Sequence, residues 1–330
     1  MTTVVDQAEE LRRMVRARAG APEAAIADPI DGDAAGRERK TARRTRVIAV
    51  ASGKGGVGKT NLAVNLGVAF TVAGKRVVVM DADLGLANVN VLLGVIPRWN
   101  LYHVIRGEKK LSQVVLDTPA GIRIIAGASG FAELANLDEE KRKRFIRGLK
   151  DIDDTDIFIV DTGAGVSNNV LSFVLAAHET IIVTSPEPTA ITDAYGIIKS
   201  VAARDPKLPM RLVVNRVRSI MEAKKVSERI IGIAKQFLHV DIDSLGFIFE
   251  DENVARAVIT QKPFVLYAPK SRASQCVDHI RRRLESEEGV GAKKDGIKQF
   301  LKKFFKISAT PIEDEAIAVP SNGRSKARGR

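Results

Sequence analysis

The chain has 330 residues and a formal net charge of +12, with 52 lysines and arginines against 40 aspartates and glutamates. Hydrophobic residues make up 45% of it and aromatic residues only 5%, which favours buried parallel strands covered by helices. The single cysteine, Cys276, excludes a disulfide framework and any metal site that needs several thiolates, and a half-buried thiol is expected.

The first 46 residues are polar and charged and do not resemble a signal peptide. The chain has no run of about 18 apolar residues, so no segment is expected to span a membrane. A cytoplasmic protein is therefore expected. Basic runs are usually solvated faces or tails, so the net charge alone is weak support for a nucleic-acid or anionic-membrane partner.

The N-terminal part divides into two segments. Residues 1–12 contain a short candidate helix that Asp6 can cap, with apolar residues such as Leu11 at helical spacing. A frayed amphipathic terminus is the alternative. Residues 13–46 are rich in alanine, arginine, glycine, aspartate and proline and lack periodicity, which predicts a flexible linker.

Residues 47–292 carry the pattern of one α/β domain. Short β-branched runs alternate with helical patterns, which predicts a mostly parallel twisted sheet with helices on both faces. The expected strands are 47–51, 76–80, 122–126, 157–161, 180–185, 211–215 and 246–250, and the clearest helices are 60–73, 166–177, 189–203 and 222–238. Several strands end in a polar residue, and ligands bind at that edge of such sheets.

The segment GKGGVGKT, residues 53–60, fits the phosphate-loop pattern between a predicted strand and a predicted helix. Its glycines let backbone N–H groups turn toward an anion, and the helix that starts near Gly58 adds its positive end. Lys59 is expected to reach the β- and γ-phosphates and the Thr60 hydroxyl to bind Mg²⁺. The predicted nucleotide-binding residues in this segment are Gly53, Lys54, Gly55, Gly56, Val57, Gly58, Lys59, Thr60 and Asn61.

Three aspartates follow predicted strands and can complete a nucleotide site. Asp81 and Asp161 are placed to hold the waters of Mg²⁺, and Asp83 to orient the attacking water. Each of them alone can also be a helix cap or a turn residue. The phosphate loop beside them favours the functional interpretation.

The motifs KGGVGKT, DADLGLAN, DTGAG and VVNRV together resemble the deviant Walker-A ATPases of the MinD/ParA class. The resemblance implies a slow, Mg²⁺-dependent P-loop ATPase that is active only as an ATP-sandwiched homodimer. Lys54 would reach the partner's phosphates, as an arginine finger supplied in trans does, so Lys54 and Asp83 are the expected catalytic residues. Asn215 would read the adenine, and a strand-end turn residue is the alternative for it.

Other segments narrow the resemblance. One cysteine does not match the paired cysteines of iron–sulfur branches, and three tyrosines do not match the tyrosine-rich tail of kinase relatives. DQAEELRRMV (6–15) and SPEPTAITDAYGIIKS (185–200) are similar to the FlhG/FleN family of flagellar placement and number regulators. The second segment would line the dimer face, although a plain strand-to-helix junction gives the same residues. The residues that would activate the GTPase FlhF are Asp6, Gln7, Leu11 and Arg12.

Residues 293–307, KKDGIKQFLKKFFKI, predict an amphipathic helix with lysines on its other face. The predicted membrane-facing residues are Ile297, Phe300, Leu301, Phe304 and Phe305. Such a helix suits an anionic inner membrane and binds through avidity when ATP pairs two chains. The alternative is that this helix packs on the ATPase core. Both can hold if the helix is docked in the monomer and released in the dimer. Residues 308–330 predict a loose tail.

These features predict an ATP-dependent dimerisation switch that is cytoplasmic and lies peripherally on the inner membrane when ATP is bound. It would regulate flagellar number or placement by stimulating FlhF, with flagellar C-ring proteins or a flagellar transcription regulator as further candidate partners. The alternative is a ParA-like ATPase that binds DNA or a transcription regulator. Direct sequence-specific DNA binding is not expected, because DNA-riding relatives do not need the amphipathic helix.

Overall fold

The computed structural model describes residues 44–83, 88–127, 152, 154–286, 293–294 and 296–308. The predicted FlhF-activating residues Asp6, Gln7, Leu11 and Arg12 lie outside the described residues. The same holds for most of the predicted linker, for residues 84–87 of the DADLGLAN motif and for the tail from residue 309.

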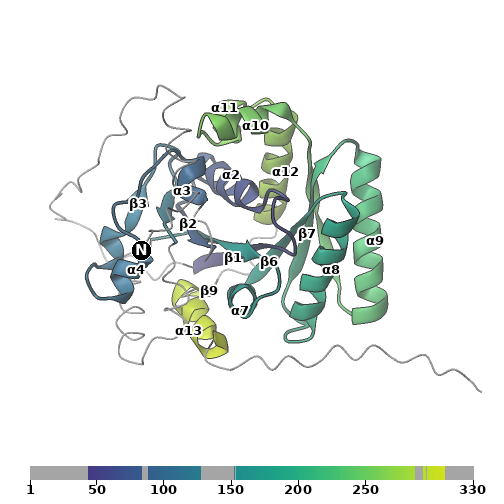
Figure 1. Ribbon diagram of the computed structural model, residues 1–330, viewed down its shortest axis with the longest axis horizontal. Helices are drawn as coiled ribbons and strands as arrows, with labels where there is room; N and C mark the ends of the chain where they lie inside the picture. The colour runs from purple at the N-terminus through teal and green to yellow at the C-terminus, as the bar shows by residue number, and fades with distance from the viewer. Residues whose placement is uncertain are drawn as a thin grey trace, which may run out of the picture.

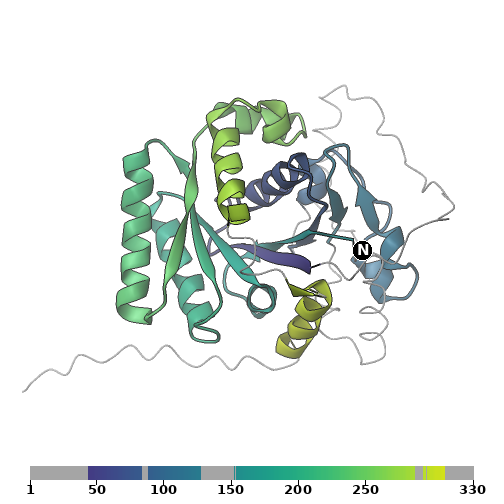
Figure 2. The ribbon, with the colours of Figure 1, turned by 180° about the vertical axis from the view of Figure 1, so that it is seen from behind.

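A single twisted sheet forms the centre of the described chain (Figures 1 and 2). Its strands follow the order β3-β4-β2-β5-β1-β6-β7-β8, and β9 pairs with β1 off this path. All pairs are parallel except β3 with β4 and β9 with β1. The strands are β1 (Arg44–Ser52), β2 (Val77–Ala82), β3 (Val115–Asp117), β4 (Arg123–Ile125), β5 (Ile157–Ala164), β6 (Glu179–Thr184), β7 (Met210–Val217), β8 (Ile242–Phe249) and β9 (Lys293–Lys294).

Helices cover both faces of the sheet, which confirms the predicted fold class. One apolar core lies between the sheet and α4, α7, α8, α9 and α13, and a second lies between the sheet and α2, α10, α11 and α12. The helices are α2 (Lys59–Val72), α3 (Val89–Leu92), α4 (Leu101–Ile105), the short 3-10 helix η1 (Leu111–Gln113), α7 (Asn168–Ala176), α8 (Pro188–Ala202), α9 (Ile220–Leu238), α10 (Glu252–Ile259), α11 (Phe264–Tyr267), α12 (Arg272–Ser286) and α13 (Gly296–Ser308).

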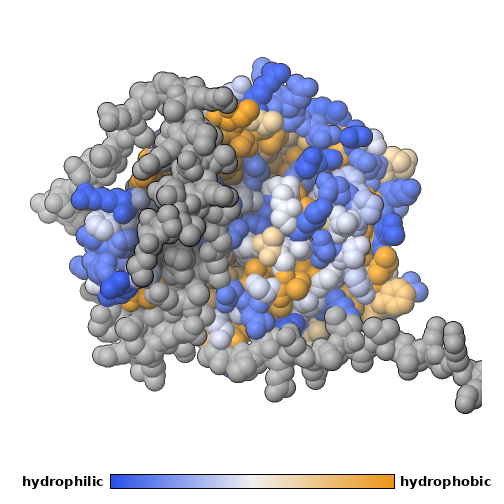
Figure 3. All heavy atoms as spheres, viewed as in Figure 1, coloured by the Kyte–Doolittle hydropathy of each residue, from blue (hydrophilic) through white to orange (hydrophobic). Residues whose placement is uncertain are grey.

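Local signals set the ends of the helices after β6 and β7. Pro188 occupies the first turn of α8, where its missing N–H costs nothing. The Ser219 side chain accepts a hydrogen bond from the Glu222 N–H and caps α9, which ends at His239 with a left-handed φ of 55°. In Figure 3 the described surface over α8 and α9 is mainly hydrophilic, with small apolar patches, because both helices turn their apolar sides to the core.

Strand β1 begins at Arg44, three residues earlier than the sequence pattern predicts. The Thr45 hydroxyl donates to the Thr155 carbonyl at 2.8 Å. Arg46 forms a buried ion pair with Glu179, in which its Nη2 donates to Oε2 at 3.0 Å. Burial of a paired arginine and carboxylate needs mutual hydrogen bonding, which these two side chains provide. The last residues of the predicted linker are therefore part of the sheet.

Helix α13 is docked on the apolar core beside the sheet. It packs on α7 and β1, and its five predicted membrane-facing side chains are each at most 4% exposed. The Phe304 ring stacks on Phe173 with centroids 4.3 Å apart, and Phe300 lies 6.0 Å from Phe158. Gly296 fits against β1 because a Cβ there would lie 2.2 Å from the Thr45 carbonyl oxygen. The apolar stripe thus faces the core, while Lys298, Lys302, Lys303 and Lys306 lie on the exposed side.

The start of the C-terminal segment also differs from the prediction. Lys293 and Lys294 are not helical but pair with Thr45 and Arg44 as β9. The start of β1 offers backbone hydrogen-bond partners to these two residues, and a local helical pattern does not take such partners into account. Among the described residues, none of the helices combines the length and apolar character that crossing a bilayer requires.

Candidate functional site

The phosphate loop joins the end of β1 to the start of α2. Gly56 and Gly58 have φ of 81° and 91°, values that glycine adopts without strain. Gly58 has a second constraint, since a Cβ there would lie 2.2 Å from the Asn215 side-chain nitrogen. The loop therefore has the backbone that the motif requires, with N–H groups free to turn toward an anion at the start of α2.

Lys59 and two aspartates meet at the inner wall of the loop. The Lys59 Nζ lies 3.1 Å from Asp161 Oδ1, and both side chains are buried. Asp81 is paired in register with Asp161 on the neighbouring strand β5. Its carboxylate accepts the backbone N–H groups of Asp83, Asn88 and Val89 at 3.1, 2.9 and 3.1 Å. Asp81 thus organises the chain after β2 as well as adding negative charge beside Asp161.

The two buried aspartates repel each other. Burial, and next the charge of Asp161, raise the pKa of Asp81 from its ordinary 3.8 to about 7. Burial also raises the pKa of Asp161, and Lys59 and a hydrogen bond from Thr60 oppose that rise. One lysine does not balance this concentration of carboxylates, so an added cation would stabilise their charged forms.

The donor set fits Mg²⁺. Thr60, Asp81 and Asp161 offer only oxygen atoms, which this cation prefers. Asp83 is half-buried and lies near the same place, since a Cβ on Gly163 of β5 would be 3.6 Å from its Oδ1. Among the described residues no cluster of three or more histidine, cysteine or acidic side chains forms a complete metal cage, so the cation would also need ligands from phosphate or water.

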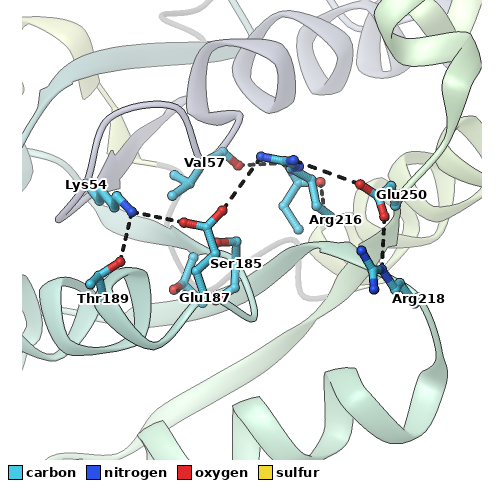
Figure 4. Close-up of polar contacts among 10 residues, drawn as sticks. Lys54, Val57, Ser185, Glu187, Thr189, Arg216, Arg218 and Glu250 are labelled. Carbon is cyan, nitrogen blue, oxygen red and sulfur yellow. Dashed lines mark hydrogen bonds and ion pairs between the residues drawn. The ribbon is translucent and has the colours of Figure 1, made fainter.

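Lys54 lies on the other side of the loop, in contact with the start of α8 (Figure 4). Its Nζ donates to Glu187 Oε2 at 2.9 Å and to the Thr189 hydroxyl at 2.8 Å. The hydrogen bond from Lys54, followed by its charge, holds the pKa of Glu187 below its ordinary value. Lys54 is 37% exposed at its side chain, whereas the Lys59 side chain is only 8% exposed. The two lysines of one loop therefore have different surroundings.

A row of charged side chains continues from Glu187 along the strand ends. Arg216 lies between Glu187 and Glu250, 3.9 Å from a carboxylate oxygen of each, and Arg218 lies 3.3 Å from Glu250 (Figure 4). Arg216 also has a φ of 60°, which is uncommon for a residue other than glycine and is often found at functional sites. This row forms an exposed charged rim beside the phosphate loop.

Asn215 connects β7 to the phosphate loop. Its side-chain nitrogen donates to the Val57 carbonyl at 2.7 Å, and its side-chain oxygen accepts the Arg216 N–H at 2.9 Å. These are the contacts of a strand-end residue that fixes the loop. One N–H and one lone pair of the amide remain for a base, and the adenine assignment stays a prediction.

The structure brings the loop, Asp81, Asp83, Asp161 and Asn215 to one edge of the sheet, as the sequence predicts. It keeps the five apolar residues of α13 apart from this edge, within the core. Sequence reasoning missed the roles of Glu187, Thr189 and Arg216 as neighbours of the loop. Signals were available, since Glu187 and Thr189 fall in the PEPTAITDAY segment and Arg216 falls in the VVNRV motif.

Comparisons with known proteins agree with this geometry. Residues 48–264 match the CobQ/CobB/MinD/ParA nucleotide binding domain. The chain is 40% identical to the antiactivator FleN of Pseudomonas aeruginosa, covering 73% of this chain and 86% of that protein. It is 35% identical to the flagellum site-determining protein YlxH of Helicobacter pylori, covering 79% and 90%.

Solved structures show the same fold. The MinD septum site-determining protein of Pyrococcus horikoshii, complexed with Mg-ADP, matches with a TM-score of 0.61 at 28% identity, over 76% of this chain and 99% of that one. The MinC:MinD complex of Aquifex aeolicus matches with a TM-score of 0.61 at 29% identity, over 74% and 97%. The phosphate loop, the aspartates and these relatives lead to one assignment: the chain belongs to the CobQ/CobB/MinD/ParA family of P-loop ATPases and, within it, to the FlhG/FleN group of flagellar regulators.

Proposed function

We propose that the chain is an ATP-dependent dimerisation switch in which Lys54 completes the phosphate site of a second copy. The observation that carries the proposal is the position of Lys54, whose ammonium is bound by Glu187 and Thr189 at the start of α8 and not by Asp161, which holds Lys59. A cation that lies at an exposed rim can be presented to another chain. If Lys54 instead pointed at the phosphate site of its own chain, hydrolysis would not require a second copy.

The contacts of Lys54 are weak enough to be exchanged. An ion pair between exposed side chains contributes little to stability, and Glu187 is 51% exposed at its side chain. A cation that stabilises the charge developing on a transferred phosphoryl group contributes several-fold more, because that charge is desolvated. Dimerisation would therefore replace a weak contact with a strong one and make hydrolysis dependent on pairing.

The other site residues divide the chemistry between them. Thr60, and through waters Asp81 and Asp161, would hold Mg²⁺, which would supply positive charge beside the phosphates. Lys59 would leave Asp161 for the phosphates, and Asp83 would orient the attacking water. The Mg-ADP bound to the Pyrococcus horikoshii relative supports the choice of ATP and Mg²⁺ as ligands here.

Membrane residence would require a change at α13. Undocking the helix exposes five buried apolar side chains at about 2 kcal/mol each, or about 10 kcal/mol in total. A bilayer interface recovers much of that energy for the helix, but not for the face of α7 that it leaves. We therefore assign release of α13 to the ATP-bound dimer, in which other contacts can replace those lost, and docking to the single chain.

The flagellar role would act through FlhF. The names of the relatives, an antiactivator and a flagellum site-determining protein, support control of flagellar number or placement. The segment with Asp6, Gln7, Leu11 and Arg12 would stimulate GTP hydrolysis by FlhF, while the ATPase cycle would decide where and when this happens. C-ring proteins or a flagellar transcription regulator remain candidate partners of the same switch.

One experiment tests the cycle as a whole. The purified chain is assayed with ATP for dimerisation by gel filtration, for pelleting with anionic liposomes or duplex DNA, and for stimulation of FlhF.

Asp83→Ala should bind ATP and remain dimeric while hydrolysis slows. Deletion of residues 1–12 should keep ATP hydrolysis and remove FlhF stimulation. ATP-dependent binding to DNA without binding to liposomes would instead support the ParA-like alternative.

A further inference from the structure

Aromatic and basic side chains gather around α4, outside the nucleotide site. Residues 96–110 contain four lysines and arginines and one acidic residue, Glu108. They also contain the single tryptophan of the chain and one of its three tyrosines. In Figure 3 the surface at the position of α4 is hydrophilic. We call this group the α4 cluster, and it consists of Arg98, Trp99, Tyr102, Arg106, Lys109 and Lys110.

Buried contacts fix the position of the α4 cluster. Leu101 and Ile105 of α4 lie in the apolar core and are 1% and 6% exposed. Asn100 caps the helix, because its side-chain oxygen accepts the Tyr102 N–H at 3.1 Å. In contrast, Arg106 is exposed and Trp99 is half-buried. The helix is therefore anchored on its inner side and presents the cluster on its outer side.

Cations lie close to both aromatic rings of the α4 cluster. The Lys109 Nζ is 4.1 Å and the Arg98 Cζ 5.3 Å from the centre of the Trp99 ring. The Arg106 Cζ is 5.3 Å from the centre of the Tyr102 ring, and its Nη1 donates to the Tyr102 hydroxyl at 2.8 Å. These contacts hold positive charge next to amphipathic aromatic side chains.

This combination fits the headgroup region of an anionic bilayer. Tryptophan and tyrosine favour the membrane–water interface, where their rings contact apolar groups and their polar tips stay hydrated. Exposed lysines and arginines are attracted by the negative potential of anionic lipids. Single-stranded nucleic acid fits less well, because its bases stack on open aromatic faces and two cations already lie near the Trp99 ring.

The docked helix α13 adds positive charge on the same face of the sheet. Its apolar residues and those of α4 belong to one core, so both helices cover that face. The lysines of α13 lie on its exposed side, and of these Lys303 is 3.5 Å from Asp205. Two basic surfaces are therefore present on this face before α13 moves.

We propose that the α4 cluster binds an anionic membrane surface while α13 stays docked, and that the lysines of α13 add to the attraction. The contact needs neither ATP nor release of α13. It therefore goes beyond the proposed ATP-dependent switch, and a test on the nucleotide-free chain can fail or succeed independently of that switch.

Trp99 provides a direct test, because the emission of the single tryptophan reports on this surface alone. Vesicles of phosphatidylglycerol and phosphatidylethanolamine, added to the nucleotide-free full chain at low ionic strength, should reduce quenching of Trp99 by acrylamide at least about two-fold. Vesicles of phosphatidylcholine, which carry no net charge, should leave the quenching unchanged. Equal quenching with both kinds of vesicle would overturn the proposal.

Vesicle sedimentation tests the cations of the cluster. R98Q/R106Q/K109Q should weaken binding of the nucleotide-free chain to the anionic vesicles by at least about ten-fold. The matched control K262Q/K270Q/R282Q removes three exposed cations near α10, α11 and α12, which cover the other face of the sheet, and should change binding by less than about two-fold. Thermal unfolding should be the same for both variants, which excludes a loss of folding as the cause.

Other outcomes would assign the surface differently. Equal binding by R98Q/R106Q/K109Q and the native chain would overturn the proposal, since another part of the chain would then hold the membrane. Binding that requires ATP would also overturn it and leave the proposed release of α13 intact. Stronger protection of Trp99 by a single-stranded oligonucleotide or by polyglutamate, at equal concentration of negative charge, would assign the cluster to a nucleic acid or an acidic protein instead.

Discussion

The rim that holds Lys54 and the face that holds α13 differ in how firmly they are closed. At the rim, exposed charged side chains make contacts that contribute little to stability, and water can replace any of them. At α13, five apolar side chains are buried against α7 and β1, at about 10 kcal/mol together. We therefore expect the contacts at the rim to break first during the ATPase cycle. Helix α13 should leave the core only when new contacts replace those it loses.

Phe304→Glu should have the largest effect. A carboxylate would be placed against Phe173 and Phe305 in the core, so we expect a loss of at least about 3 kcal/mol of unfolding free energy. Thermal unfolding of the nucleotide-free chain measures this loss. Lys302→Glu on the exposed side of the same helix is the matched control and should change stability by less than about 0.5 kcal/mol. Equal melting temperatures for Phe304→Glu and the native chain would show that the helix is not docked.

Lys54→Gln should have the next largest effect. Removing the cation supplied to the second copy should lower ATP turnover by at least about a hundred-fold and leave nucleotide affinity within a few-fold. Steady-state phosphate release and fluorescent-nucleotide titration separate the two effects. If turnover survives, Lys54 does not act in the partner's site and the rim has another role.

The pH dependence of stability should depend on Asp81. Its raised pKa means that the folded chain binds a proton more tightly than the unfolded chain, so the carboxylate destabilises the unliganded fold as pH rises from about 4 to about 7. Asp81→Asn should remove up to about 4 kcal/mol of this decline, since the pKa of Asp81 rises from 3.8 to about 7 on folding. Urea unfolding at several pH values measures the difference between the two chains. Parallel pH profiles would contradict the buried repulsion between Asp81 and Asp161.

Glu187→Gln should have the smallest effect. It removes the charge that holds Lys54 in its own chain. The ATP concentration at which half of the chains are dimeric should therefore shift by at most about five-fold. A shift to lower ATP would mean that the contact opposes pairing. A shift to higher ATP would mean that Glu187 also serves the paired state, and Thr189→Ala, which leaves the charge, is the control.

Sequence reasoning performs differently in these two regions. The phosphate loop and Asp81, Asp83 and Asp161 follow from local patterns, since each residue is placed by the strand before it. The apolar stripe of α13 predicts the helix correctly. It does not predict what the stripe contacts, because a bilayer and the face of α7 can both bury the same phenylalanines. The contacts of Glu187 with Lys54 and with Arg216 join residues far apart in sequence, and the start of β1 depends on Glu179 and Thr155. A local pattern therefore does not predict these contacts.

The pairing of β9 with the start of β1 fixes where α13 begins relative to the phosphate loop. β1 begins beside Lys293 and Lys294 and ends at the phosphate loop nine residues later, about 30 Å away. The start of β1 and the start of α13 therefore lie at one pole, and the phosphate loop lies at the opposite pole. If two copies meet face to face over their phosphate loops, the starts of β1 and α13 lie away from the paired surface, so contacts made at that pole would not compete with pairing.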